Sequence, residues 1–435
     1  MGDHVARVPA EVLPRGVCRV VIGLVVNPVA GVGGPAGLAG SDGADVQRLA
    51  LARGARSRVQ ERAVLALTML AERHPGLVVA TAAGAMGADA VRAAGLVPRV
   101  VAPALGVERN ETEAGDTSRA VAALAADGVD LILVVGGDGT LRDAVAGLEG
   151  AEHPSGAGTD VGRHAERSAP GGMDARQVHA DAEHADTRMP AVLGVPAGVK
   201  MYSPVFAVSP RAAGAIAADW IDLGGLPTDE REVLDIDEAA MRRARVDPTL
   251  YGMLRVPYRS GRTQARKAPT PVTEAAAVEA AARGAVARML PGVRYLLGPG
   301  GTTAEIARQL GVEGSPLGVD VVLDGTIVVC GASEQELLAE IAEGPAQAVV
   351  TVIGGQGFLL GRGNQQLSAA VLRALGDDPL LVVAPEQKLI DLHGRPLLVD
   401  TGDPELDARL AGHVRIVTGA GTSSLYAVSA PELIP

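Results

Sequence analysis

A single carboxylate lies between glycines where residues 136–140 read Gly-Gly-Asp-Gly-Thr. Glycines at a strand-to-helix turn let backbone N–H groups approach a ligand closely, and the positive end of the helix favours phosphate. An acid beside bound phosphate is unfavourable unless a cation or an acidic proton offsets its charge. Phosphoryl transfer to a hydroxyl requires both. The turn therefore indicates phosphoryl transfer; the alternative interpretation of Asp138 is an N-cap on the following helix.

The residues around this turn predict that it lies at the carboxyl end of a strand in a parallel sheet. Residues 131–135 are apolar and rich in β-branched side chains, which predicts a buried strand, and residues 141–148 have the spacing of an amphipathic helix. A first strand over 17–26 ends in a second glycine-rich loop, 27–34. Ligands of such sheets bind at the carboxyl ends of the strands. The residues expected to bind phosphate there are Asn27, Gly31, Gly33, Gly34, Gly136, Gly137, Gly139 and Thr140.

The last third of the chain repeats the order of apolar strand and glycine turn twice, at 295–303 and at 349–358. Either the chain contains a partial internal duplication, or several strand ends line one nucleotide cleft. An amide-rich segment, 364–366, offers donors and acceptors suited to a base or ribose edge, although helix capping is the alternative. The candidate cofactor-binding residues of this part are Gly300, Gly301, Thr302, Thr303, Gly354, Gly355 and Asn364.

Two further charged residues are candidates for the chemistry. Lys200 follows a strand, where a point charge would meet a β- or γ-phosphate; the alternative is a surface lysine. Asp143 follows Asp138 by one turn of helix and could join it in a Mg²⁺ site, or face solvent.

Composition divides the chain into a flexible N-terminus (1–16), an N-terminal α/β domain (17–225), a connecting segment (226–290) and a C-terminal domain (291–435). Within the first domain, residues 150–189 contain almost no large apolar side chain, which predicts a disordered or mobile insertion. The predicted fold class is α/β, with a Rossmann-like parallel sheet in the first domain, a C-terminal domain that is α/β or β-rich, and a cleft between them.

Charge and hydropathy restrict the partners of this chain of 435 residues. Its net charge of −12 argues against general binding to nucleic acid or anionic membranes, so a nucleotide site must be a local positive patch. No apolar run is long enough for a membrane span, and no secretory signal is expected. Two cysteines fit a reducing cytoplasm. We expect a cytoplasmic homo-oligomer that binds a small nucleotide substrate.

The Gly-Gly-Asp-Gly-Thr turn and the Asn-Pro-x-x-Gly-x-Gly-Gly loop at 27–34 together resemble the superfamily of NAD kinases, diacylglycerol-type lipid kinases and 6-phosphofructokinases. More narrowly, residues 196–203 (PAGVKMYS), 298–303 (GPGGTT) and 354–366 (GGQGFLLGRGNQQ) resemble the AcoX-type branch of the ATP–NAD kinase family. The resemblance implies a two-domain kinase with its active site in the interdomain cleft, an ATP or polyphosphate donor, and Mg²⁺. It implies that Asp138 matches the carboxylate that serves as general base or metal-linked acid, and that Asn27 lies beside the nucleotide.

One departure concerns the acceptor. Ordinary NAD kinases follow the Gly-Gly-Asp-Gly-Thr turn with an Asn-acid pair that holds the NAD adenosine, but this chain has no asparagine between Thr140 and Gln356. The prediction is an ATP-dependent kinase acting on a hydroxyl of a nucleotide-like acceptor, with NAD the first candidate. A lipid kinase would share the turns but need an apolar or basic membrane face. A non-catalytic nucleotide-binding regulator is the other alternative.

Overall fold

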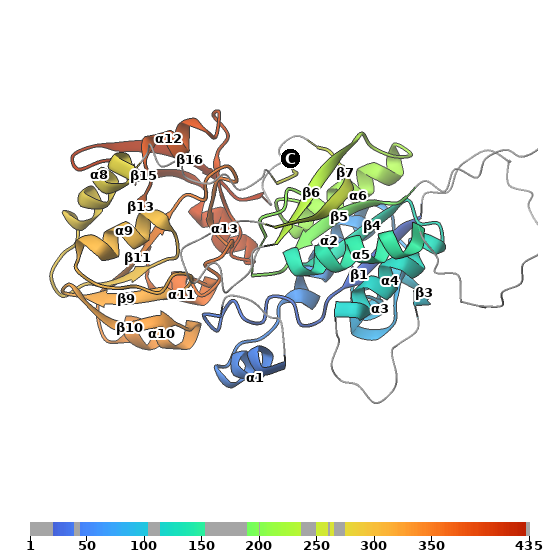
Figure 1. The fold of residues 1–435 in the computed structure, drawn as a ribbon, viewed down its shortest axis with the longest axis horizontal. Helices are drawn as coiled ribbons and strands as arrows, with labels where there is room; N and C mark the ends of the chain where they lie inside the picture. The colour runs from blue at the N-terminus through green and yellow to red at the C-terminus, as the bar shows by residue number, and fades with distance from the viewer. Residues whose placement is uncertain are drawn as a thin grey trace, which may run out of the picture.

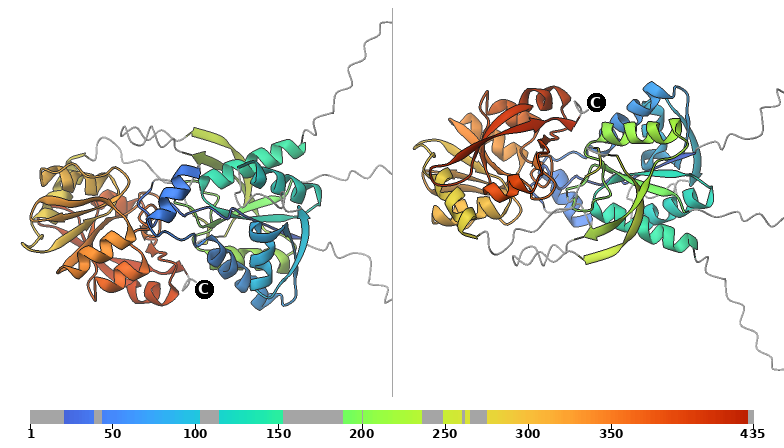
Figure 2. Two further views of the ribbon diagram at one scale, coloured as in Figure 1. Left: turned by 90° about the horizontal axis from the view of Figure 1, so that it is seen from below. Right: turned by 90° about the horizontal axis from the view of Figure 1, so that it is seen from above.

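The computed structural model describes residues 21–38, 44–102, 114–152, 189–199, 201–235, 249–259, 262–264 and 275–431. The predictions for the N-terminal 16 residues, for Lys200 and for most of the insertion lie outside these residues. Two domains lie side by side (Figure 1), and the segment that carries α1 (Ala44–Ala52) lies at their junction in every view (Figure 2). The predicted two-domain α/β fold is confirmed.

The N-terminal domain is built on a five-stranded sheet in the order β3-β2-β1-β4-β5, and every strand pair is parallel. Its strands are β1 (Ile22–Val26), β2 (Val78–Ala82), β3 (Val97–Ala102), β4 (Leu131–Gly136) and β5 (Ala191–Pro196). The central strands β1 and β4 are buried along their whole length, as expected of a parallel sheet covered on both faces.

Helices pack on this sheet in two pairs, α2 with α6 and α4 with α5. The helices of the domain after α1 are α2 (Val59–Arg73), the 3₁₀ turn η1 (Gly84–Met86), α3 (Ala88–Ala93), α4 (Ala114–Ala126), α5 (Asp138–Glu152) and α6 (Pro210–Asp222). Ser209 caps α6 by accepting a hydrogen bond from the Ala212 N–H, and Pro210 occupies the first turn, where its missing N–H costs nothing.

The segment 226–290, expected to connect the domains, is divided between them. It forms an antiparallel hairpin of β6 (Thr228–Asp235) and β7 (Thr249–Pro257), which packs on α5 and contributes buried side chains to the N-terminal core. It also forms α8 (Ala275–Val286), which packs in the C-terminal domain.

The C-terminal domain contains a nine-stranded mixed sheet in the order β10-β9-β8-β11-β13-β15-β16-β14-β12. The strands are β8 (Arg294–Leu297), β9 (Val319–Leu323), β10 (Thr326–Ala332), β11 (Ala346–Thr351), β12 (Phe358–Leu360), β13 (Leu380–Val383), β14 (Leu397–Val399), β15 (Gly412–Val417) and β16 (Ser423–Ser429). The central strands β8, β11, β13 and β15 run parallel, so their carboxyl ends share one edge.

Two apolar clusters build the core of this domain. One contains residues of α8 and α9 (Gly301–Gln309), and the other contains residues of α10 (Glu334–Ala342) and α11 (Ala369–Ala374). The remaining helices are α12 (Glu386–Ile390) and α13 (Pro404–Leu410). Among the described residues of both domains, no helix is long and apolar enough to cross a membrane.

Candidate functional site between the two domains

Loops from the carboxyl ends of the N-terminal strands meet one another and the second domain. The first glycine loop follows β1, and a Cβ on Gly31 would lie 2.2 Å from the carbonyl oxygen of Ala197, which follows β5. Gly31 also has φ of +75°, a conformation that favours glycine. A Cβ on Gly34 would lie 3.1 Å from the Cβ of Gln365 in the C-terminal domain. Glycine at these positions therefore permits three segments to pack in close contact.

The Gly-Gly-Asp-Gly-Thr turn is held by the neighbouring loops. The Asn27 side-chain amide donates a hydrogen bond of 3.1 Å to the Thr140 hydroxyl, so these two predicted site residues are together, as the pairing of β1 with β4 requires. A Cβ on Gly136 would lie 2.2 Å from that hydroxyl, and one on Gly198 would lie 2.3 Å from the Gly137 Cα. The segment after β5 therefore packs directly on the turn.

Asp138 begins α5 but does not cap it. Its carboxylate accepts hydrogen bonds from the Tyr202 N–H at 2.6 Å, from the Ser203 N–H at 3.0 Å and from the Ser203 hydroxyl at 2.6 Å. Ser203 is itself fixed, because its hydroxyl oxygen accepts a hydrogen bond from the Leu234 N–H of β6 at 3.0 Å. Asp138 is only 1% exposed. Its carboxylate thus ties the Gly-Gly-Asp-Gly-Thr turn to the segment 196–203.

Burial raises the pKa of Asp138 to about 6, because a desolvated carboxylate disfavours its charged form. The hydrogen bonds from Ser203 and Tyr202 lower the pKa and limit the rise, while the charge of nearby Asp235 adds to it. A carboxylate with a pKa near neutral pH has the proton affinity that suits a general base.

A cavity of about 380 Å³ lies between the domains. On the N-terminal side its lining residues are Gly31, Pro35, Arg56, Arg58, Arg62, Ala197, Gly198 and Met201. On the C-terminal side they are Glu334, Gly361, Gln365, Leu367, Ser368, Ala369, Ala370, Arg373, Asp400 and Thr401. The first glycine loop thus contributes to the wall, and so does the segment that binds Asp138.

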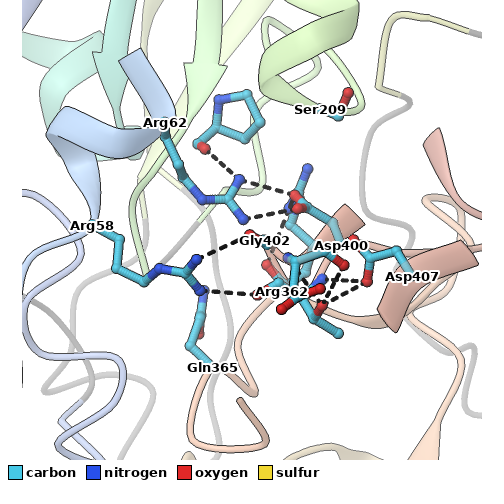
Figure 3. A network of polar contacts seen from close by, with 12 residues as sticks. Arg58, Arg62, Ser209, Arg362, Gln365, Asp400, Gly402 and Asp407 are labelled. Carbon is cyan, nitrogen blue, oxygen red and sulfur yellow. Dashed lines mark hydrogen bonds and ion pairs between the residues drawn. The ribbon is translucent and has the colours of Figure 1, made fainter. Parts of the chain in front are cut away.

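A buried ion network closes one wall of this cavity (Figure 3). Asp400 binds Arg62 of α2 through both carboxylate oxygens, at 3.0 and 2.8 Å, and accepts a further bond of 2.8 Å from Arg362. The two cations, with the stronger effects from Arg62, hold the pKa of Asp400 down at about 2 in spite of its burial. The network joins the N-terminal domain to the loop after β14.

Arg362 is the central residue of this interface. Besides Asp400, it donates to the Val208 carbonyl at 3.0 Å and to the Gln264 side chain at 3.2 Å, both from the N-terminal domain. Its guanidinium lies 4.1 Å from the centre of the Phe358 ring, a residue of β12 that packs in the N-terminal core. Arg58 adds donated bonds to the carbonyls of Thr401 and Gly402, which Figure 3 also shows.

The structure places the other predicted site residues apart from the cavity. Gly300–Thr303 and Gly354–Gly355 lie at the carboxyl ends of β8 and β11, where the Lys388 ammonium is 3.4 Å from the Thr302 hydroxyl. Asn364 holds its own loop, since its side chain accepts from the Gly361 N–H at 2.9 Å and donates to the Leu359 carbonyl at 2.8 Å.

The predicted pairing of Asp138 with Asp143 in a Mg²⁺ site stays a prediction. Asp143 forms an ion pair of 3.4 Å with Arg142, whereas Asp138 is bound by Tyr202 and Ser203. Across the part of the chain that the structure describes, no group of three or more His, Cys, Asp or Glu side chains is placed to hold a metal ion.

Sequence reasoning missed the arginines of the cavity and their partner Asp400. A signal was present, because Arg53, Arg56, Arg58 and Arg62 follow the first glycine loop closely in a chain with a net charge of −12. No comparable signal marks Asp400, which is 338 positions from Arg62.

Comparison with known protein families matches both sides of this cleft. The family model described as the ATP-NAD kinase N-terminal domain matches residues 22–154, and the ATP-NAD kinase C-terminal domain matches residues 290–428. The chain belongs to the ATP-NAD kinase family. Searches among curated proteins and among solved structures gave no match. The family matches include β1 with the first glycine loop, the Gly-Gly-Asp-Gly-Thr turn, and the loops that carry Arg362 and Asp400.

Proposed function

We propose that this protein is a phosphotransferase that moves a phosphoryl group from ATP to a hydroxyl of a nucleotide-like acceptor, with NAD as the first candidate. The observation that carries the proposal is the cavity between the domains. Its wall contains the first glycine loop and a set of arginines. It also contains part of the segment 196–203, whose last two residues bind Asp138. Phosphoryl transfer relies on positioning and charge stabilisation, and such a cavity supplies both.

In the proposed reaction Asp138 accepts the proton of the attacking hydroxyl. Its pKa of about 6 keeps the carboxylate largely ionised at neutral pH while retaining proton affinity. Because Asp138 is only 1% exposed, the segment 196–203 must open to admit the acceptor, as lids of other enzymes do. Lys200 lies in this segment, and we propose that it neutralises charge on the transferred group.

Mg²⁺ belongs to the proposal as an ion that neutralises charge on the phosphates of the donor. Among the described residues, no group of three or more His, Cys, Asp or Glu side chains is placed to hold this ion.

The decisive test is release of ADP from ATP and Mg²⁺ with a panel of NAD, NADH, nucleosides, sugars and diacylglycerol. With the best acceptor, Asp138→Asn should lower kcat by about 10²- to 10⁴-fold, because a general base contributes that much. The matched control is Asp377→Asn, an exposed carboxylate of the loop after α11, which should keep wild-type kcat. Activity of Asp138→Asn within a few-fold of wild type would remove Asp138 from the chemistry.

One observation favours a second candidate, a nucleotide-binding protein without turnover. Both oxygens of the Asp138 carboxylate bind Tyr202 and Ser203, so the carboxylate already has a structural role. This candidate predicts clear nucleotide binding and no ADP release with any acceptor. Turnover that depends on Asp138 would contradict it.

A further inference from the structure

Several carbonyl groups of the segment 196–203 are bound by side chains of the C-terminal domain. The Gln365 amide donates hydrogen bonds to the Gly198 carbonyl at 3.1 Å and to the Val199 carbonyl at 3.3 Å. The Gln356 amide donates a hydrogen bond of 3.0 Å to the Met201 carbonyl. Residues 197–199 and 201–203 lie outside helices and strands, so these carbonyls take their donors from side chains. Two glutamines of one domain therefore hold a segment of the other.

Gln356 is a fixed donor. It lies in the turn after β11, where the Gly357 N–H donates to the Ile353 carbonyl at 2.8 Å and the Ile353 N–H donates to the Phe358 carbonyl at 3.0 Å. Gln356 is 5% exposed, and both Ile353 and Phe358 pack in the N-terminal core. The turn is thus closed by its own hydrogen bonds and anchored at both ends. A change in the Gln356 contact therefore requires the segment 196–203 to move.

A single peptide group connects Gln356 to Asp138. The Met201 carbonyl accepts the hydrogen bond of Gln356. The Tyr202 N–H of the same peptide unit donates to the Asp138 carboxylate at 2.6 Å. The unit is planar and trans, so its two polar groups keep a fixed relation to each other. A movement that takes this peptide away from Asp138 therefore also changes its hydrogen bond to Gln356.

The segment can leave the two glutamines at little cost. Gln365 and Gly198 both line the cavity of about 380 Å³. A carbonyl that faces this cavity can accept a hydrogen bond from water, whereas a buried carbonyl without a donor is costly. On the N-terminal side, Gln264 donates to the Met201 carbonyl at 2.8 Å and remains as its second donor. Release from the glutamines therefore leaves the Gly198 and Met201 carbonyls with partners.

We propose that Gln356 and Gln365 are positioning residues that hold the segment 196–203 closed over Asp138, and that the acceptor hydroxyl reaches Asp138 when the segment leaves these two side chains. The inference rests on the proposed function, in which Asp138 is the general base. Because Asp138 is 1% exposed, only the open form binds the acceptor productively, and the apparent KM rises as the open fraction falls. The strength of the two glutamine contacts thus sets the KM for the acceptor.

Hydrogen exchange of the full chain without ligand tests the inference independently of turnover. In Gln365→Ala and in Gln356→Ala, the backbone amides of Tyr202 and Ser203 should exchange about five- to tenfold faster than in wild type. The reason is that each variant loses hydrogen bonds that stabilise the closed form. The amides of β4, residues 131–135, should keep their wild-type rates and so report that the variants are folded.

The matched control is Gln347→Ala. Gln347 is a glutamine of the same domain that donates to a carbonyl, that of Asp378 at 3.3 Å. This variant should leave the exchange of the segment 196–203 at the wild-type rate. If Gln356→Ala loses the protection of its β4 amides, Gln365→Ala decides alone, because its truncated side chain lies in the wall of the cavity.

The kinetics of the acceptor give a second readout. The KM for the best acceptor should fall about five- to tenfold in Gln365→Ala, because the open fraction increases by that factor. The kcat should stay near the wild-type value, because the segment is open in both proteins once the acceptor is bound. A merely structural role of Gln365 would instead raise KM or lower kcat.

Each outcome supports or overturns the inference. Wild-type exchange of the Tyr202 and Ser203 amides in the glutamine variants overturns it, and so does equal acceleration in Gln347→Ala. A rise in the KM for the acceptor overturns the occlusion of Asp138 by the segment. Failure of the proposed function is recognised separately, as faster exchange in the glutamine variants without ADP release in the acceptor panel. That result removes Asp138 as general base and supports the hold of the glutamines on the segment.

Discussion

Asp138 and Asp400 are both buried carboxylates, yet their environments shift their pKa values in opposite directions. Asp138, in the N-terminal domain, is bound by two backbone amides and a hydroxyl, all of them neutral, and its pKa rises to about 6. Asp400, at the interface, is bound by two arginines, and its pKa falls to about 2. Burial alone disfavours the charged form in both, so the charge of the partner decides the direction. The first environment suits proton transfer, and the second holds two domains together.

The largest effect is expected from Asp400→Asn. The substitution leaves the buried Arg362 without its counter-ion, and loss of one partner of a buried pair costs about 3–5 kcal/mol in the free energy of unfolding. Urea unfolding measures the change. Asp45→Asn is the control, because it breaks the exposed pair with Arg48 and should change the unfolding midpoint very little. Equal midpoints for the two variants would show that the interface does not depend on Asp400.

The pH dependence of stability should separate the two carboxylates. The folded-state pKa of Asp138 lies above its ordinary value of 3.8, so the stability it contributes is full below about pH 4 and lost as the pH rises through about 6. A shift of about two units corresponds to about 3 kcal/mol. The unfolding free energy of wild type relative to Asp138→Asn should therefore fall by about 3 kcal/mol between pH 4 and pH 7.

Asp400 should behave in the opposite way in a more acidic window. Its lowered pKa contributes stability above about pH 4, and this contribution is lost as the pH falls toward 2. The free energy of unfolding of wild type should therefore exceed that of Asp400→Asn at neutral pH, and this excess should be lost only below pH 4. The difference in unfolding free energy between wild type and variant should therefore follow opposite courses for Asp138→Asn and Asp400→Asn. The same course for both variants across pH 2–7 would contradict the opposite pKa shifts of the two carboxylates.

A smaller effect is expected from Ser203→Ala. The change removes one hydrogen bond to Asp138 and leaves the Leu234 N–H without its acceptor, which should cost about 1–2 kcal/mol. In the wild type this hydrogen bond lowers the pKa of Asp138, so its loss should raise that pKa. The acidic limb of the pH–rate profile should therefore move to higher pH. The control Ser423→Ala, at an exposed position of β16, should move neither the unfolding midpoint nor the profile. An unmoved acidic limb in Ser203→Ala would separate Ser203 from the titration of Asp138.

The AcoX-type branch, the homo-oligomer and the acceptor stay predictions. The two-domain α/β fold and the ATP-NAD kinase family could be predicted from sequence because their signals are local. Apolar runs that end in glycine turns specify buried strands followed by loops with close backbone contacts, as at 131–140. The environment of Asp138 was not predictable, because its partners come from residues more than 60 positions away.

The sequence by itself determined where the chain forms parallel strands and which turns contain glycines that permit close backbone approach. It also determined that a nucleotide site in so acidic a protein must be a local patch of positive charge. Only the tertiary structure decided which charges form that patch. Arg62 and Asp400 are 338 positions apart, and pairing of residues so distant depends on the packing of one domain against the other. Local patterns carry no record of such contacts, because propensity and periodicity act only over neighbouring residues.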